Sequence, residues 1–267
     1  MSKNLKLLSI LLLTLLCAGI ISAAELTTGV YKFGKNKKGY LFLPENFKPG
    51  PHNKFILFMH GRGAAAGKPG NFGSKEFEKF RQLCSEKGYV VAVPPLVSTW
   101  FNPQAEKNVD AMLNQLAVDL QMDLSRFHVV GCSMGAMSAL VYAGRNSERV
   151  ITLTDIFGVT DIKTFCQGKY KENIKAAYGG SYDEKKPLYE SRSPINYVSV
   201  LKNIPILILH GAADVSVPPV HSQQLYDAIT QAGGKQIKLI IVPKIPHSNV
   251  IIKTRENMVF EFMEAHK

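Results

Sequence analysis

The pentapeptide Gly131-Cys132-Ser133-Met134-Gly135 could present a nucleophile at the edge of a sheet. It follows an apolar run, 127–130, that predicts a strand, and it precedes a helical pattern that continues to Tyr142. A sharp strand-to-helix turn forces its serine into a strained backbone conformation, and only residues without bulk fit two positions away on either side. The pattern therefore favours a Ser133 hydroxyl that is raised clear of the sheet.

A serine hydroxyl attacks well only when a base removes its proton and a carboxylate orients that base. Histidine can accept a proton near neutral pH. His247 is the predicted base because it follows the apolar run 237–242 and precedes the last helical pattern. His221 is a rival, but we expect it on a helix with its side chain facing solvent. Two further histidines precede glycines at predicted strand ends and are expected to position loops: His60 and His210.

Two aspartates come at the ends of apolar runs and could orient the base. Asp214 follows the run 206–209 after a short loop, and Asp155 ends the run that begins at Val150. Both fit the chain order of serine, acid and histidine that hydrolases built on an open α/β sheet follow. From these residues alone, either aspartate could be the acid.

Hydrolysis through a tetrahedral intermediate also needs backbone N–H groups that stabilise an oxyanion. We expect one from Met134, which follows the nucleophile, and one from Arg62 in the loop 60–63. The Arg62 side chain would then be free either to bind an anionic substrate group or to face solvent. Trp100, the only tryptophan, follows the apolar run 90–93 and either walls a substrate pocket or anchors its loop.

The elements that must position these residues alternate along the chain. Apolar runs predict strands, and the patterns around 109–120 and 225–229 predict amphipathic helices between them. Strands that are apolar at most positions are covered on both faces, which indicates a parallel sheet between helical layers. Segments 30–33 and 40–43 predict an antiparallel hairpin at the sheet edge. The predicted strands are 55–59, 90–93, 127–130, 150–153, 206–209 and 237–242.

The run 123–135 resembles the elbow region of α/β-hydrolase esterases, and of prolyl-oligopeptidase-like and dienelactone-hydrolase-like enzymes, which commonly place an Asp-x-x-Arg turn before this strand. Segment 206–214, a strand followed by His-Gly-x-x-Asp, and the His-Gly loop at 60–63 resemble the same family. The resemblance implies an α/β-hydrolase fold with a mostly parallel sheet of about eight strands and helices on both faces. It also favours Asp214 over Asp155 as the acid.

We expect residues 25–267 to form one catalytic domain. The stretch 158–203 is long for a connection between strands. Its Tyr178-Gly179-Gly180 and Ser193-Pro194 resemble the small cap insertion of esterase and oligopeptidase-like relatives, so we expect a cap there.

The N-terminus has the pattern of a secretory signal peptide. Lys3 and Lys6 precede the apolar run 7–21, and Ser22-Ala23-Ala24 supplies small residues for cleavage after residue 24. The apolar run of about fifteen residues is short against the ~20 that span a bilayer, which argues against a membrane anchor. We therefore expect a protein exported to the periplasm or secreted, with no stable membrane insertion after cleavage of 1–24.

Composition bears on partners and cofactors. The formal charge is +11, but the lysines are scattered, which favours a solvated basic surface over a nucleic-acid interface. The segment 61–67 imitates a dinucleotide fingerprint, yet Pro69-Gly70 breaks the helix that it should open. No His or Cys pair has metal-ligand spacing, and the odd set Cys84, Cys132 and Cys166 is no disulfide framework. We expect no cofactor, no metal and no nucleic-acid partner.

Together these features predict a serine carboxylesterase (EC 3.1.1.-) that acts through an acyl-enzyme on a small-molecule or polymer-borne ester. The alternative within the family is a prolyl-oligopeptidase-like peptidase, which is less favoured because no propeller segment accompanies the domain and its cleft is expected to be open. The alternative from another class is a non-catalytic binding protein on the same fold. The intact set of Ser133, Asp214 and His247 argues against it. No oligomeric state is favoured.

Overall fold

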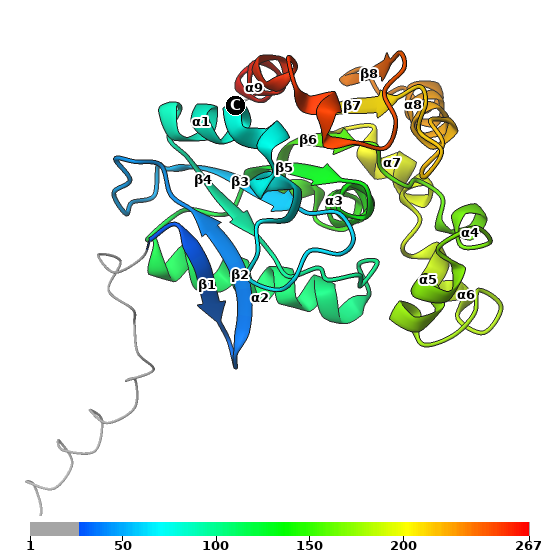
Figure 1. Cartoon of the computed structure of the whole chain (residues 1–267), viewed down its shortest axis with the longest axis horizontal. Coiled ribbons are helices and arrows are strands. Elements are labelled where there is room, and N and C mark those ends of the chain that lie inside the picture. Colours follow the sequence, from blue (N-terminus) through cyan, green and yellow to red (C-terminus); the bar gives the residue numbers. More distant parts are fainter. Residues whose placement is uncertain (1–26, 267) are drawn as a thin grey trace, which may run out of the picture.

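A computed structural model describes residues 27–266 of the 267-residue chain, and Figure 1 shows its arrangement. The predicted signal peptide, 1–24, lies outside the described residues. An eight-stranded sheet runs through the molecule in the order β1-β2-β4-β3-β5-β6-β7-β8. The strands are β1 (Gly29–Phe33), β2 (Lys37–Phe42), β3 (Lys54–Met59), β4 (Tyr89–Val93), β5 (Phe127–Cys132), β6 (Val150–Ile156), β7 (Ile206–Gly211) and β8 (Ile237–Val242).

Strand β2 runs in the direction opposite to the other seven strands of this sheet. It pairs antiparallel with both β1 and β4, while β3 to β8 pair in parallel. The predicted hairpin at the sheet edge is therefore confirmed. Strand order and direction also confirm the α/β-hydrolase fold that the resemblance implied.

The central strands are apolar at nearly every position because both faces of the sheet are covered. In β3, Ile56 and Phe58 point into one core, and the alternate residues Leu57 and Met59 point into the other. All four side chains are buried.

Helices α1 (Glu78–Glu86) and α9 (Glu256–Glu264) cover one face of the sheet. The opposite face is covered by α2 (Pro103–Asp119), α3 (Met134–Arg145) and α8 (Val220–Gln231). Short 3-10 segments lie between the longer elements: η2 (Gly70–Gly73), η3 (Lys75–Phe77), η4 (Ser147–Arg149), η5 (Pro194–Tyr197) and η6 (Asn249–Ile252). Among residues 27–266, no helix combines the length and the apolar character that a bilayer crossing requires.

The segment between β6 and β7, where the sequence predicts a cap, holds four short helices. They lie beside the sheet at the end of the molecule that carries β7 and β8 (Figure 1). Helix α5 ends at Gly179, whose φ of 71° is the left-handed conformation that glycine adopts readily. The helices are α4 (Ile162–Phe165), α5 (Lys171–Tyr178), α6 (Lys186–Glu190) and α7 (Val198–Leu201).

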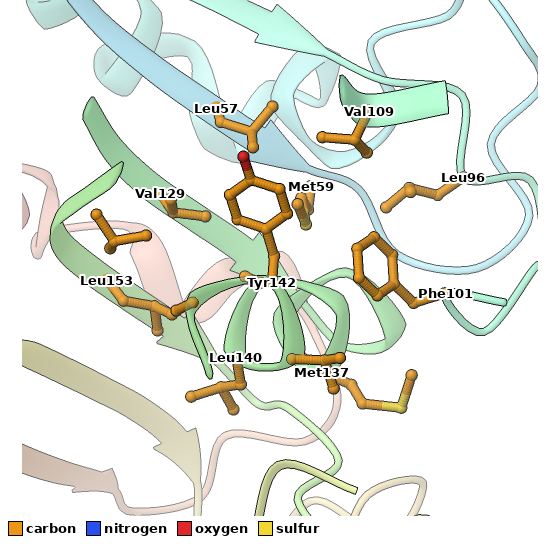
Figure 2. Packing of buried hydrophobic residues seen from close by; sticks show 14 of the residues in the cluster. Leu57, Met59, Leu96, Phe101, Val109, Val129, Met137, Leu140, Tyr142 and Leu153 are labelled. Carbon is orange, nitrogen blue, oxygen red and sulfur yellow. The ribbon is translucent and has the colours of Figure 1, made fainter. Parts of the chain in front are cut away.

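Helix α3 lies at the centre of the larger core, and Tyr142 projects from it among side chains of β3, β5 and α2 (Figure 2). The first turn of this helix packs against the end of β3 without room for a side chain. A Cβ atom at Gly135 would lie 2.0 Å from the Met59 carbonyl oxygen. The second glycine of the pentapeptide is therefore required by helix-to-strand contact.

Gly135→Ala should destabilise the fold, because the new methyl group meets backbone atoms that cannot move aside. Overpacking of this kind costs about 1–3 kcal/mol, so we expect a loss of about 3 kcal/mol in the free energy of unfolding. Urea denaturation measures this loss.

Gly168→Ala is the matched control, because the nearest atom to its added Cβ is 3.6 Å away and its φ is not positive. It should change stability by less than about 0.5 kcal/mol. Equal stability of the two variants would contradict the packing argument.

Candidate active site

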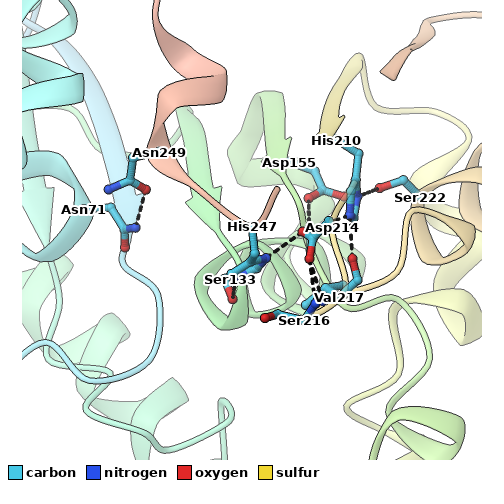
Figure 3. Close-up of polar contacts among 11 residues, drawn as sticks. Asn71, Ser133, Asp155, His210, Asp214, Ser216, Val217, Ser222, His247 and Asn249 are labelled. Atoms are coloured by element: carbon cyan, nitrogen blue, oxygen red, sulfur yellow. Dashed lines mark hydrogen bonds and ion pairs between the residues drawn. The ribbon is translucent and has the colours of Figure 1, made fainter. Parts of the chain in front are cut away.

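The carboxyl ends of three parallel strands, β5, β7 and β8, bring the predicted reactive residues together. Ser133 follows β5, Asp214 follows β7 by a short loop, and His247 follows β8. Figure 3 shows their side chains pointing toward one another. Open α/β sheets present their ligand sites at the carboxyl ends of their strands, and all three residues lie there.

The backbone at Ser133 is strained. Its φ and ψ are 56° and −123°, a combination that residues with side chains rarely adopt. Residues on either side must be small for the chain to turn here: a Cβ at Gly131 would lie 2.5 Å from the Gly135 carbonyl oxygen. The turn leaves the Ser133 side chain partly exposed, whereas its neighbours in the pentapeptide are buried.

A chain of hydrogen bonds joins the three residues. His247 Nε2 lies 2.9 Å from Ser133 Oγ, and His247 Nδ1 lies 2.6 Å from Asp214 Oδ2. With Nδ1 protonated, the ring donates to the carboxylate and Nε2 accepts the hydroxyl proton. The His247 ring also lies 4.5 Å from the Phe157 ring, which supports it from one side. This geometry is that of a nucleophile, a base and an orienting acid.

The Asp214 carboxylate is almost fully buried and receives several N–H groups. The Ser216 and Val217 amides both donate to Oδ1 at 2.9 Å. His210 Nε2 lies 3.4 Å from Oδ2. Burial raises the pKa of Asp214, but hydrogen bonds from His210, His247 and the Val217 amide outweigh it, so this pKa lies well below its ordinary value. The carboxylate is therefore ionised and can stabilise a protonated imidazole.

The rival acid, Asp155, does not contact the predicted base. Its Oδ1 accepts a hydrogen bond from the Gly158 amide at 2.8 Å, and its buried Oδ2 has no partner among the described residues. Burial raises the pKa of Asp155 to about 6, although the His210 ring and the Gly158 amide oppose this. The geometry therefore places Asp214, and not Asp155, behind His247.

The expectation that His221 faces solvent is wrong. It is 6% exposed, Thr160 contacts its ring nitrogen, and the Phe165 ring packs against it at 5.5 Å. The long connection after β6 covers this side of α8, which its amphipathic pattern could not show. Burial lowers the pKa of His221 to about 4, so the ring is neutral.

The two histidines at strand ends hold loops, as their positions before glycines suggested. His210 bonds to Ser222 Oγ at 2.6 Å and to the Val217 carbonyl at 2.8 Å. His60 accepts a hydrogen bond from the Leu96 amide at 3.2 Å. These bonds fix the loops that follow β3, β4 and β7.

The two backbone N–H groups expected to stabilise an oxyanion are free of hydrogen bonds to other described residues. Within residues 27–266, neither the Met134 amide nor the Arg62 amide donates to a protein acceptor. Met134 opens α3, whose first amides have no intrahelical partner. Their role in stabilising an oxyanion remains a prediction.

A cavity of about 400 Å³ opens over Ser133 and His247. Trp100, Phe165 and Tyr170 line one of its walls, and Arg62 also borders it. Trp100 is 2% exposed and its indole N–H donates to Asn173 at 2.6 Å, so it both walls the cavity and anchors its loop. The sequence left these two roles as alternatives, and the structure combines them.

Two asparagines that sequence reasoning missed join the loops on the other side of the site. Asn71 Oδ1 accepts the Gly61 amide at 2.6 Å, and Asn71 Nδ2 donates to Asn249 Oδ1 at 2.7 Å (Figure 3). Asn249 Nδ2 in turn donates to Ser74 Oγ at 3.1 Å. This bridge ties the loop that carries Arg62 to the segment that follows His247. No local sequence pattern predicts this bridge.

Within the described part of the chain, no group of three or more His, Cys, Asp or Glu side chains is arranged to hold a metal ion. The three cysteines there, Cys84, Cys132 and Cys166, are free and buried. Burial raises the pKa of the Cys132 thiol well above its ordinary value, so the side chain beside the nucleophile stays neutral.

The buried carboxyl of Asp155 predicts a pH-dependent difference in stability. Its folded-state pKa of about 6 exceeds the value of about 3.9 expected in the unfolded chain. The folded state therefore binds the extra proton, and this contribution to stability falls as pH rises from about 4 through 6.

Asp155→Asn cannot titrate, so its free energy of unfolding should rise relative to wild type by roughly 2 kcal/mol between pH 4 and pH 7. Urea denaturation at several pH values measures the difference. If the difference in unfolding free energy between the variant and wild type stays constant with pH, then Asp155 has the same pKa in the folded and unfolded states, which contradicts the prediction.

The asparagine bridge predicts a kinetic effect. Asn71→Ala frees the Gly61 amide and releases the loop before Arg62, so kcat on an activated ester should fall about 10- to 100-fold with little change in KM. Asn53→Ala is the control. Asn53 also makes two hydrogen bonds, to the Lys48 and Gly50 carbonyls, but it lies at the amino end of β3, away from the site. It should lose stability without losing kcat. Equal kcat in both variants would leave the bridge a purely structural feature.

Comparison with known proteins agrees with this site. A model of the prolyl oligopeptidase family matches residues 107–266. The uncharacterized peptidase YuxL of Bacillus subtilis is 25% identical over 232 residues, which are 79% of this chain and 33% of YuxL. The chain thus spans about a third of the length of this curated relative.

Two solved structures share the fold. An acylaminoacyl peptidase from Pyrococcus horikoshii has a TM-score of 0.68 at 19% identity, over 90% of this chain and 42% of that one. An S-formylglutathione hydrolase from Agrobacterium tumefaciens has a TM-score of 0.69 at 17% identity, over 90% and 95%. The family match covers more than half of the chain and contains Ser133, Asp214 and His247. The chain therefore belongs to the prolyl oligopeptidase family.

Proposed function

We propose that the protein hydrolyses carboxylic esters through an acyl-enzyme intermediate, with Ser133 as nucleophile, His247 as base and Asp214 as acid. The observation that carries this proposal is the continuous hydrogen-bonded chain from Ser133 Oγ through His247 to Asp214 Oδ2 at the floor of an open cavity. Export through the N-terminal segment 1–24 belongs to the same proposal.

Acylation begins when Ser133 Oγ attacks the ester carbonyl carbon and its proton moves to His247 Nε2. The developing oxyanion accepts hydrogen bonds from the Met134 and Arg62 amides. Asp214, ionised and fixed by backbone amides, stabilises the imidazolium without taking its proton. Collapse of the intermediate breaks the bond to the leaving alcohol, which takes the proton from His247.

Deacylation repeats these steps with water as the nucleophile. His247 removes a proton from the water, the hydroxide oxygen bonds to the acyl carbon, and Ser133 leaves with the proton that His247 returns. The products are the free acid and the alcohol, and the side chains regain their starting protonation states.

The size and wall of the cavity support an ester over a peptide. A volume of about 400 Å³ bordered by aromatic rings suits a small acyl or aryl group better than an extended polypeptide. The second candidate is an oligopeptidase-like serine peptidase, which family membership favours. Both candidates use the same three residues, so substrate assays must separate them.

The first assay is hydrolysis of p-nitrophenyl esters from acetate to octanoate, run beside aminoacyl p-nitroanilides and with fluorophosphonate labelling. We expect ester turnover that exceeds anilide turnover, and loss of both labelling and turnover in Ser133→Ala. Labelled protein that cleaves only anilides would favour the peptidase. Turnover that survives in Ser133→Ala would reject the nucleophile.

The acid is tested by paired variants. Asp214→Asn should lower kcat by about 10⁴, the effect known for removing the charge of a triad aspartate. Asp155→Asn should retain most of the activity, because its carboxyl does not contact His247. The reverse result would make Asp155 the acid.

A further inference from the structure

We propose that Arg62 and the face of Tyr170 form a subsite for a substrate carboxylate, with Lys169 as a second cation, so that the enzyme prefers esters that carry a free carboxylate. This inference rests on the proposed esterase function and names its substrate class. The Arg62 guanidinium lies 5.0 Å from the centre of the Tyr170 ring, and Lys169 Nζ lies 5.5 Å from the same ring.

The subsite borders the reaction centre. Arg62 and Tyr170 both line the cavity that contains Ser133 and His247. Arg62 directly follows Gly61, and a Cβ on Gly61 would lie 3.6 Å from Ser133 Cβ. The long Arg62 side chain therefore starts next to the nucleophile and ends against the opposite aromatic wall.

The aromatic wall is rigid. The Trp100, Phe165 and Tyr170 rings pack against one another with centroid distances of 5.5 to 5.8 Å. Two hydrogen bonds fix Trp100: its indole N–H donates to Asn173 Oδ1, and its backbone carbonyl accepts from the Tyr178 hydroxyl at 2.7 Å. A wall held in this way keeps the Tyr170 face in place for Arg62 before substrate binds.

The two cations carry no compensating charge. Within residues 27–266, neither Arg62 nor Lys169 forms an ion pair. Glu76 also lines the cavity, but it interacts electrostatically with Lys75 and Lys253 and belongs to η3, which packs on η6.

Asp161 lines a second cavity together with Lys169 and Tyr170, and its carboxylate caps α4. It accepts the Lys163 amide at 2.9 Å and the Thr164 hydroxyl at 3.1 Å. The Arg62 guanidinium thus keeps N–H donors that no carboxylate among residues 27–266 takes up.

A carboxylate fits these donors better than other groups do. Guanidinium binds carboxylates through two parallel N–H···O bonds, and a guanidinium placed over an aromatic face is held in one orientation. The neighbouring rings then cover the apolar part of the same substrate. Suitable substrates are hemiesters of dicarboxylic acids, or esters whose alcohol part bears a carboxylate.

Matched substrate pairs test the subsite on either side of the ester bond. For the acyl side, 4-nitrophenyl hemiglutarate is compared with 4-nitrophenyl valerate. For the alcohol side, 4-acetoxybenzoate is compared with its methyl ester. The measured quantity is kcat/KM for the anionic ester divided by that for its neutral partner. This ratio cancels changes that affect both substrates equally, including any shift of the oxyanion loop.

In Arg62→Met, the ratio for at least one pair should fall about tenfold, which corresponds to about 1.4 kcal/mol. Arg62→Lys should retain part of the preference, and Lys169→Met should lower the ratio less. Arg126→Met is the control. It removes one exposed cation at the amino end of β5, whereas the reaction centre lies at the carboxyl ends of the strands. It should leave both ratios unchanged.

An unchanged ratio for both pairs in Arg62→Met, with neutral esters still hydrolysed, would overturn the subsite and leave the esterase proposal standing. An equal fall in Arg126→Met would also overturn it, because the effect would then come from net charge. Absence of turnover on all four esters would overturn both the esterase proposal and the subsite.

Discussion

The site depends on the close approach of α3 to the end of β3. Gly135 packs against the Met59 carbonyl, and Gly131 packs against the first turn of α3, so neither position can hold a side chain. Because the helix starts this close to the sheet, the chain has no relaxed path from β5 into α3. Ser133 absorbs the strain with a positive φ. Core packing, and not the backbone preference of serine, thus fixes the position of the Ser133 hydroxyl.

The other two reactive residues depend on the same sheet in a different way. Asp214 is held by the amides of Ser216 and Val217, and His247 is held by the carboxylate and by the Phe157 ring. Backbone donors do not change rotamer, so the acid is preorganised before substrate arrives. The backbone amides therefore fix the carboxylate, and the carboxylate orients the imidazole toward Ser133.

Sequence reasoning predicted the features that have a local signature. The glycines around Ser133, the apolar strands and the chain order of the reactive residues each constrain a short segment, and the structure agrees with them. It missed Asn71 and Asn249, because their hydrogen bond joins residues 178 positions apart and asparagine carries no periodic signal. It placed His221 in solvent for a related reason: the Phe165 ring that covers it comes from a connection whose path no local pattern determines.

The contacts that hold the cavity wall differ from those that hold Ser133, Asp214 and His247. Trp100 and Tyr170 come from the loop after β4 and from the segment between β6 and β7, and side-chain hydrogen bonds fix the wall, such as that of Trp100 to Asn173. None of these bonds involves the residues that strain Ser133 or hold Asp214. We therefore expect a substitution in the wall to change which group fits beside Arg62 without moving Ser133. Under the proposed function, substrate selection and bond cleavage would be separable, because the wall and the hydrogen-bonded chain depend on different sets of contacts.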